Sequence, residues 1–356
     1  MRLRRFAAAA VFSVAAFAAS IETAVAQTVL RDAEIEQWIK DYSYPIFKVA
    51  GIEPASVNIL LIGDQSINAF AGGLNMGIHT GLLSNADTPN QVLGVIAHET
   101  GHIAGGHSQR SSDAMARAST PILLSLVLAA GAIAAGAPEA GMGILGLGQN
   151  IAIGEYLTYS RGQEATADQA ALTYLEATGQ SGRGLVEFFG KLRNEQIIRG
   201  YKLNPYLQSH PLANDRIAAL EQRAKASSYY AKADTPEEIA RLHLIRGKIR
   251  GFMQEPNVTF RQYPLTDQSD EAAYARAVAY YRNADIDKGV KEIDRLIAKS
   301  PNDPYFYELK GQMLFEFGRV ADSVAPHRRS VELAPDKALL KINYGRALAA
   351  TEDQDM

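Results

Sequence analysis

His98, Glu99 and His102 form a His-Glu-x-x-His pattern within an apolar stretch of the chain. In a helix, this spacing places both imidazoles on one face, one turn apart, where they fit two positions of a tetrahedral zinc ion. Glu99 follows the first histidine and can reach a metal-bound water as a general base. The pattern also occurs by chance on ordinary amphipathic helices. Because these three side chains are costly on a buried helix unless they are paired or bind a metal, we favour a zinc site.

The third metal ligand must come from another part of the chain. One class of zinc enzymes has a further histidine six residues after the second, but that position is Ser108 and the nearby histidine is His107. One residue rotates a helix by about 100°, so we expect His107 to support the site or the core. Glu164, on a helix predicted over residues 161 to 177, completes a His-His-Glu set with water as the fourth ligand. Asp168, one turn later, is placed to accept a hydrogen bond from a ligand imidazole; the alternative is a solvated acidic face.

The composition limits the class of protein. The 356 residues are 47% hydrophobic, which suffices for two compact domains or for one domain and a repeat array. With 36 basic and 39 acidic residues, the net charge is −3, which gives no electrostatic footprint for nucleic acid. There is no cysteine, so a metal site must use histidine and carboxylate.

The first 26 residues are typical of an export signal. Three arginines precede an apolar core from Phe6 to Ala19, and Ala24-Val25-Ala26 supplies small residues for cleavage. Gln27 is therefore the expected mature N-terminus. The alternative is an uncleaved membrane anchor, which the short apolar run disfavours. We expect the rest of the chain to work outside the cytoplasm.

The elements that position the zinc motif follow from periodicity and helix caps. Apolar residues recur at helical spacing over residues 32 to 51, whereas residues 57 to 62 and 74 to 80 are predicted as strands. We expect the strand at 74 to 80 to offer its edge to an extended substrate. The zinc-motif helix begins after Thr88, a suitable N-cap that can form a capping box with Gln91.

Residues 121 to 148 are strongly apolar and rich in alanine and glycine. Pro138 and Glu139 divide this segment into two arms, and neither arm has the roughly 20 apolar residues of a spanning helix. Two interpretations remain open. The segment is either a buried helical hairpin or a hairpin that leans on or dips into a membrane face.

The last part of the chain has a period of 34 residues. Pro301 and Pro335 show this spacing, and so do Ala277, Gly311 and Gly345. A small residue in the first helix and a proline after the second are typical of tetratricopeptide repeats. The third unit has only its first helix. Because a short array is marginal by itself, we expect it to pack on the domain before it.

Several segments, in this order, resemble the gluzincin peptidases related to the CAAX-prenyl protease and the heat-shock membrane protease. The segments are Asn68-Ala69-Phe70-Ala71-Gly72-Gly73, Gly81-Leu82-Leu83, His98-Glu99-Thr100-Gly101-His102, Ser160-Arg161 with Glu164 and Ala167-Asp168, and Ser209-His210-Pro211 with Arg216. The resemblance implies zinc on His98, His102 and Glu164. It also implies roles for His210 and Arg216 near the metal. His210 either stabilises the oxyanion or caps the metal to keep the enzyme latent, and an ordinary turn residue is the alternative.

We therefore predict a mostly α fold with a small β-sheet, in which a gluzincin-type metallopeptidase domain precedes a short tetratricopeptide-like array. The predicted boundaries are a signal peptide at 1–26, the peptidase domain at 27–228, a helix and linker at 229–268, and the repeats at 269–356.

The predicted function is that of a periplasmic metalloendopeptidase with one Zn²⁺ per chain. Its expected substrates are unfolded or misassembled envelope proteins, and the outer-membrane assembly machinery is an expected partner of the repeats. Residues 121 to 148 are expected to contact a membrane surface, and no nucleic-acid partner is expected. One alternative is a chaperone-like assembly factor with a largely latent metal site. A structural zinc site is a second alternative, which an adjacent general base disfavours.

Overall fold

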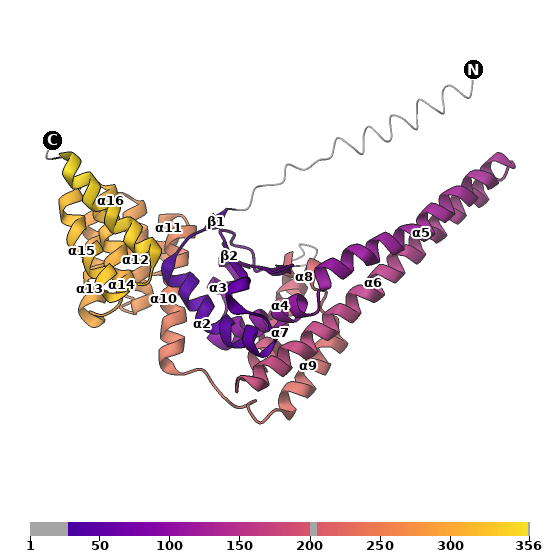
Figure 1. Ribbon diagram of the computed structural model, residues 1–356, viewed down its shortest axis with the longest axis horizontal. Helices are drawn as coiled ribbons and strands as arrows, with labels where there is room; N and C mark the ends of the chain where they lie inside the picture. The colour runs from indigo at the N-terminus through magenta and orange to yellow at the C-terminus, as the bar shows by residue number, and fades with distance from the viewer. Residues whose placement is uncertain (1–27, 200–204, 355–356) are drawn as a thin grey trace, which may run out of the picture.

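The computed structural model describes residues 28–199 and 205–354, which form a mostly helical chain with one small sheet (Figure 1). The predicted fold class is confirmed. The predicted signal peptide at 1–26 lies outside the described residues. Two groups of elements follow each other along the chain: a sheet with its covering helices, and an array of antiparallel helices at the C-terminal end.

The sheet has four strands in the order β1-β2-β4-β3. β1 (Val29–Leu30) pairs antiparallel with β2 (Asn58–Ile62), β2 pairs parallel with β4 (Asn75–His79), and β4 pairs antiparallel with β3 (Ala69–Gly72). Gly73, with a φ of 60°, makes the tight turn between β3 and β4. The prediction that residues 74 to 80 offer a strand edge is wrong, because β4 is hydrogen-bonded on both sides. The sheet edges are β1 and β3.

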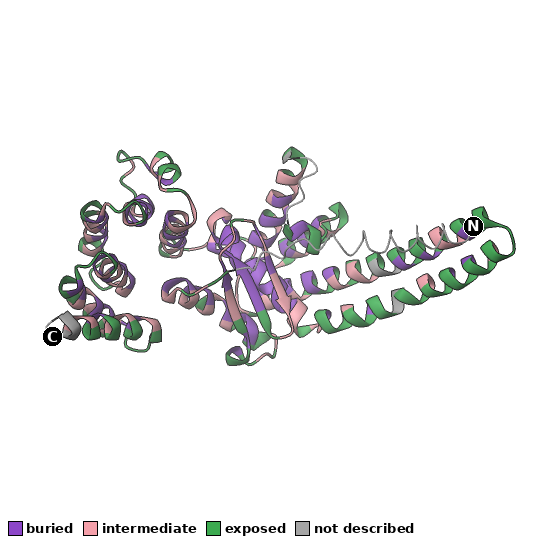
Figure 2. Cartoon of the chain, turned by 90° about the horizontal axis from the view of Figure 1, so that it is seen from above, coloured by how far each residue is buried: buried purple, intermediate pink, exposed green. Residues whose placement is uncertain are grey.

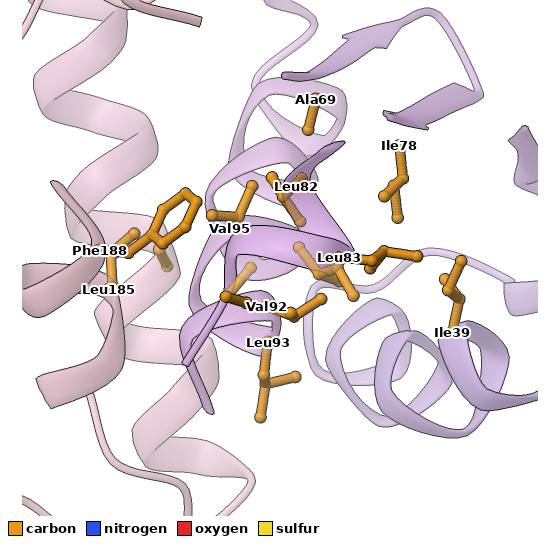
Figure 3. Close-up of a cluster of buried hydrophobic side chains, with 14 of the residues drawn as sticks. Ile39, Ala69, Ile78, Leu82, Leu83, Val92, Leu93, Val95, Leu185 and Phe188 are labelled. Carbon is orange, nitrogen blue, oxygen red and sulfur yellow. The ribbon is translucent and has the colours of Figure 1, made fainter. Parts of the chain in front are cut away.

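The helix that carries the zinc motif lies at the centre of this part of the fold. That helix is α4 (Pro89–Ala104). The other helices of this part are α2 (Ala33–Val49), α3 (Thr80–Asn85), α7 (Arg183–Arg199), α8 (Pro205–Ser209) and α9 (Asn214–Ala226), with a short 3₁₀ turn at Pro54–Ser56. Figure 3 shows apolar side chains of α4, such as Val92 and Val95, between Phe188 of α7 and Leu83 of α3. α4 is therefore a rigid support, because apolar contacts surround it on several sides.

A long helical hairpin leaves this core and projects away from it (Figure 1). Its helices are α5 (His107–Ala134) and α6 (Pro138–Ala177), and the second helix returns to the core. The helix predicted at 161 to 177 is thus the last part of a much longer one. The interpretation of residues 121 to 148 as a buried hairpin is wrong, since its side chains are mostly exposed (Figure 2). By length and composition α5 is also long and apolar enough to cross a membrane, contrary to our expectation.

The C-terminal part is built from helix pairs. Its elements are α10 (Pro236–Met253), α11 (Pro256–Gln262), α12 (Asp270–Arg282), α13 (Ile286–Lys299), α14 (Pro304–Glu316), α15 (Val320–Leu333) and α16 (Ala338–Gln354). The segment predicted as a helix and linker, 229–268, contains the short helix α11 after α10. α12, α14 and α16 begin 34 residues apart, as do α13 and α15, so the sequence period corresponds to helix pairs with a single helix in the third unit. The assignment to tetratricopeptide repeats stays a prediction.

A buried cluster of charges joins the array to α2. The Glu34 carboxylate is 1% exposed and accepts hydrogen bonds from Lys248 Nζ (3.0 Å) and the Tyr274 hydroxyl (2.7 Å). Arg241 lies 3.1 Å from Glu34 and 2.6 Å from Asp303. Burial opposes ionisation, but Lys248 and Arg241 outweigh it and lower the pKa of Glu34. The array is therefore attached to the first part through buried charges as well as apolar contacts.

Glu34→Ala is expected to destabilise the protein by about 3 kcal/mol, because it removes the counter-charge that Lys248 and Arg241 share in the interior. The thermal unfolding midpoint, followed by circular dichroism, measures the loss. Glu221→Ala is the control, because it breaks only an exposed pair with Lys225 and should leave the midpoint unchanged. Equal midpoints for Glu34→Ala and the wild type would contradict a stabilising role for the cluster.

Candidate metal centre

The local structure of α4 sets the position of the zinc motif. Thr88 caps the helix, with its hydroxyl accepting a hydrogen bond from the backbone N–H of Gln91 (3.3 Å). The Gln91 side chain accepts from the backbone of Asp87 (2.9 Å) and not from Thr88, so the predicted capping box is not formed. His98 and Glu99 are fully buried within the helix.

A glycine brings the second helix close to this motif. A Cβ atom at Gly101 would lie 2.9 Å from the Cα atom of Ala167 on α6, so only glycine allows α4 and α6 to approach this closely. Glu164 is one turn before Ala167 on the same helix. The close approach therefore places the Glu164 carboxylate against the two histidines of α4.

Four side chains meet in one largely buried group: His98, His102, Glu164 and His210. His98 Nε2 lies 3.1 Å from His102 Nε2, 3.3 Å from His210 Nδ1 and 3.4 Å from Glu164 Oε2. His102 Nε2 is 3.4 Å and His210 Nδ1 is 3.0 Å from Glu164 Oε1. A tetrahedron of nitrogen and oxygen ligands about 2.0–2.1 Å from zinc has edges of about 3.3–3.4 Å. The donor types and their spacing thus fit a zinc ion.

The protonation of the two motif histidines differs because their surroundings differ. Burial and the neighbouring His98 lower the pKa of His102 to about 2, which keeps it as the neutral imidazole that binds metals. Burial opposes a proton on His98 as well, but Asp168 and Glu164 outweigh it and raise the pKa of His98 to about 9. Burial alone would raise the pKa of Glu164. Hydrogen bonds and charge interactions with His210 and His98 outweigh burial and lower this pKa. The carboxylate is therefore ionised, as a metal ligand must be.

Asp168 and Arg216 contact His98 and Glu164 on the side away from the centre of the group. Asp168 Oδ1 lies 2.9 Å from His98 Nδ1, as predicted for a partner that orients the imidazole. Arg216 donates to both oxygens of Asp168, and its Nη1 lies 2.9 Å from Glu164 Oε2. Arg216 therefore contacts both carboxylates, where it can hold them in position.

His210 lies directly after α8, at the remaining face of the group. Its Nε2 atom lies 3.5 Å from Glu99 Oε1, and its ring stacks on Tyr206 at 4.6 Å between centroids. Neither carboxylate oxygen of Glu99 has a hydrogen-bond partner among the described residues. The predicted base thus lies beside the metal group and beside the histidine for which two roles were predicted.

Three residues contact the site in ways that the sequence analysis did not predict or left open. His107 Nδ1 lies 2.9 Å from His102 Nδ1, because α4 ends at Ala104 and Gly106, with a φ of 60°, redirects the chain. Phe189 packs its ring edge-to-face with His98 at 5.6 Å. Tyr206 was also missed, although it precedes His210 by one helical turn and so offered a signal in the spacing.

Asp168→Asn is expected to lower hydrolysis by about 10- to 100-fold, because the amide cannot hold the His98 imidazole and Arg216 as the carboxylate does. Zinc affinity, measured by competition with a fluorescent chelator, should fall by a similar factor. The thermal midpoint serves as a folding control. A wild-type rate and affinity in Asp168→Asn would remove Asp168 from the site.

A comparison with known families agrees with this geometry. The model described as peptidase family M48 matches residues 30–224, more than half of the chain. The chain belongs to peptidase family M48. M48 is a gluzincin-type family of zinc-dependent metallopeptidases, so the predicted resemblance, enzyme class and metal are confirmed at the level of the family.

Relatives of this M48 chain come from several bacteria. The "Beta-barrel assembly-enhancing protease" of Yersinia pestis is 24% identical over 294 residues, which cover 81% of this chain and 60% of the relative. The protein of that name in Escherichia coli strain K12 is 23% identical over 296 residues, 79% of this chain and 58% of the relative. A Vibrio cholerae protein is 26% identical over 291 residues, with 79% and 58% covered. The chain spans about three-fifths of the length of these relatives.

Proposed function

We propose that this chain is a zinc metalloendopeptidase that hydrolyses peptide bonds of unfolded or misassembled envelope proteins. The observation that carries the proposal is the largely buried set of His98, His102 and Glu164, with Glu99 beside it. The Glu99 carboxylate accepts no hydrogen bond within the described part of the chain. A structural zinc site would not need such a base. The relatives named for β-barrel assembly support a role in the assembly or quality control of outer-membrane proteins.

Glu99 carries the proton transfers in this proposal. When bound, zinc supplies a water of lowered pKa and polarises the scissile carbonyl. Glu99 takes a proton from the attacking water and delivers it to the leaving amine. Asp168 holds His98 through Nδ1, so that Nε2 stays directed into the group. Arg216 holds the carboxylates of Asp168 and Glu164 in place and balances their charge.

An extended substrate has one sheet edge available near α4. β3 (Ala69–Gly72) is an edge strand and packs against α4, whereas β4 is enclosed between β2 and β3. We therefore assign substrate pairing to the outer edge of β3. Unfolded proteins expose the extended segments that such pairing requires, which fits the proposed substrate class.

Digestion of an unfolded protein tests the proposal. The purified mature chain is expected to cleave casein or an unfolded porin, to stop when a chelator removes the metal, and to recover when zinc is added back. Mass spectrometry should find cuts inside the substrate rather than only at its ends. Digestion that resists the chelator would contradict a metallopeptidase. So would the absence of cleavage by both the zinc-loaded wild type and the zinc-loaded chain that lacks the His210 side chain.

The position of His210 favours a second reading of the same site, in which hydrolysis is restrained and the chain also acts as a chaperone-like assembly factor. His210 Nδ1 lies in the fourth position of the ligand group, where the catalytic water must bind. A histidine cap in that position would keep the peptidase latent until a substrate or partner displaces it. In the alternative role, the His210 imidazole does not bind the metal and donates a hydrogen bond to the oxyanion of the transition state.

His210→Ala is expected to raise casein hydrolysis several-fold at unchanged zinc content, because it frees the fourth position for water. Both quantities are measured on the same preparation, and Ser209→Ala is the control in the same turn. A loss of more than about tenfold would instead assign His210 to transition-state stabilisation. No change in either quantity would leave it as an ordinary turn residue.

The remaining parts of the proposal concern location and partners. We propose the domain boundaries 27–228, 229–268 and 269–356, and the family match at 30–224 supports the first. The predicted signal at 1–26, with the expected cleavage after Ala26, favours a periplasmic location, and the helix pairs of the array favour binding to the outer-membrane assembly machinery. Contact of residues 121 to 148 with a membrane surface belongs to the same proposal.

A further inference from the structure

The projecting hairpin of α5 and α6 carries large apolar side chains all around its outer surface. On α5, Leu126 is 48% exposed, Val127 71% and Leu128 53%. Successive residues on a helix point about 100° apart, so these three span about 200° of its circumference. The full set of large exposed apolar residues in this segment is Leu123, Leu124, Leu126, Val127, Leu128, Ile133, Met142, Leu147, Ile151 and Ile153. A binding face for one protein partner would occupy a single side.

The contact between the two helices is made by small residues instead. Ser125 and Ala129 on α5 are 5% and 1% exposed, and Ala152 on α6 is 4% exposed. A Cβ atom at Gly141 would lie 2.7 Å from Ile133 Cγ1, and one at Gly148 would lie 2.2 Å from the Ser125 hydroxyl. The helices therefore approach through glycine, alanine and serine, and the large side chains point outward. This arrangement is the reverse of a water-soluble hairpin and is typical of helices packed in lipid.

The distribution of charge agrees with a lipid environment. Between Arg117 and Glu155 the sequence contains a single charged residue, Glu139, just after the turn of the hairpin. Charged residues return at the base, with Arg110 and Asp113 on α5 and Arg161 on α6. A solvent-exposed helical surface normally carries charged residues along its whole length, whereas charged residues are unfavourable in the lipid hydrocarbon.

The length of the apolar part limits how far it enters. Pro121 to Ala134 are 14 residues, or about 21 Å of helix, and Pro138 to Gly154 are 17 residues, or about 25 Å. The hydrocarbon core of a bilayer is about 30 Å thick. α5 as a whole is long enough to cross a membrane, but its apolar part and that of α6 both fall short of the far side. Since they join at a tight turn, both ends return to the same side of the membrane.

We propose that the hairpin formed by residues 121–154 inserts into a lipid bilayer from one side, passing the near leaflet without crossing the membrane, and so anchors the metal centre next to the membrane surface. This deepens the membrane contact named above and rests on that part of the proposed function, but not on peptidase activity. A second copy of the chain would cover only one side of the hairpin and would leave most of these side chains in water.

Flotation with lipid vesicles tests insertion. Purified mature chain is mixed with vesicles of phosphatidylethanolamine and phosphatidylglycerol, and the wild type and Glu99→Gln are both expected to float with them. The double variant Leu124→Glu, Val127→Glu should lower the bound fraction at least tenfold, because it brings two charges into hydrocarbon. Leu265→Glu, at a position 65% exposed on the array, is the matched control and should float like the wild type.

Zinc content and casein hydrolysis in detergent-free buffer show whether the double variant is folded. Wild-type protein that stays out of the vesicles, or a double variant that floats equally well, would overturn the proposal and leave the peptidase assignment intact. A dimer in light scattering that the double variant dissociates, without flotation of the wild type, would assign the hairpin to a second copy instead.

The absence of cysteine allows a direct test of depth. Single variants Ala135→Cys at the tip and Met115→Cys at the base, each labelled with an environment-sensitive dye, are bound to vesicles. The tip dye should be shielded from a water-soluble quencher on either side of the membrane, and the base dye should be quenched only from outside. Quenching of the tip by reagent enclosed in the vesicle would show a crossing hairpin, and quenching from outside would show one lying on the surface. Either result would overturn one-sided insertion.

Discussion

Glu99→Gln is expected to keep one zinc ion per chain and to lose hydrolysis by about 10²- to 10⁴-fold, the contribution of a positioned general base. The amide has the size and shape of the carboxylate but cannot accept the proton of the attacking water. Because Glu99 is fully buried and none of the described residues forms a hydrogen bond with its carboxylate, the substitution should disturb little else. Initial rates of casein cleavage, with zinc measured on the same sample, give the result.

His210→Ala provides the background in which this effect is easiest to see. If His210 caps the metal, the wild-type rate of hydrolysis is already low. The double variant His210→Ala, Glu99→Gln is then compared with His210→Ala alone. The thermal midpoint of both proteins should match. Normal turnover by Glu99→Gln in the uncapped background would rule out Glu99 as the base.

Glu164→Ala is expected to lose both zinc and activity. The carboxylate lies within 3.4 Å of all three histidines, and it also pairs with Arg216 at 2.9 Å. Without it, a divalent cation would meet neutral imidazoles and the positive charge of Arg216, which disfavours binding. The zinc-to-protein ratio after dialysis measures the effect.

Glu221→Ala, which removes an exposed carboxylate of α9, is the control for Glu164→Ala and should keep its zinc. Glu164→Gln adds a second comparison, since it preserves the volume of the side chain while removing its charge. Full zinc content and activity in Glu164→Ala would place the third ligand elsewhere.

Local patterns in the sequence were enough to predict the parts of the site that lie on helices. The spacing of His98 and His102 determines their common face, and the same rule places Glu164 and Asp168 on one side of α6. The cap at Thr88 predicted where α4 begins. These features depend on the neighbouring residues, so a single sequence contains the information.

Features that depend on residues distant in the sequence were predicted wrongly or left open. The strand at 74 to 80 looks like a possible edge by composition, but its position inside the sheet depends on β2 and β3 pairing on either side. The contact of His107 with His102 depends on the turn at Gly106. The hairpin could be read as buried or as membrane-facing because an apolar sequence fits both environments, and only the arrangement of its neighbours separates them.

The zinc content of the purified mature chain tests the central claim most directly. Metal analysis by mass spectrometry, on protein dialysed against metal-free buffer, is predicted to give one zinc per chain for the wild type and almost none for His98→Ala, His102→Ala and Glu164→Ala. A wild-type chain that holds no zinc after loading would contradict the proposed metal centre. So would full zinc content in all three of these single variants.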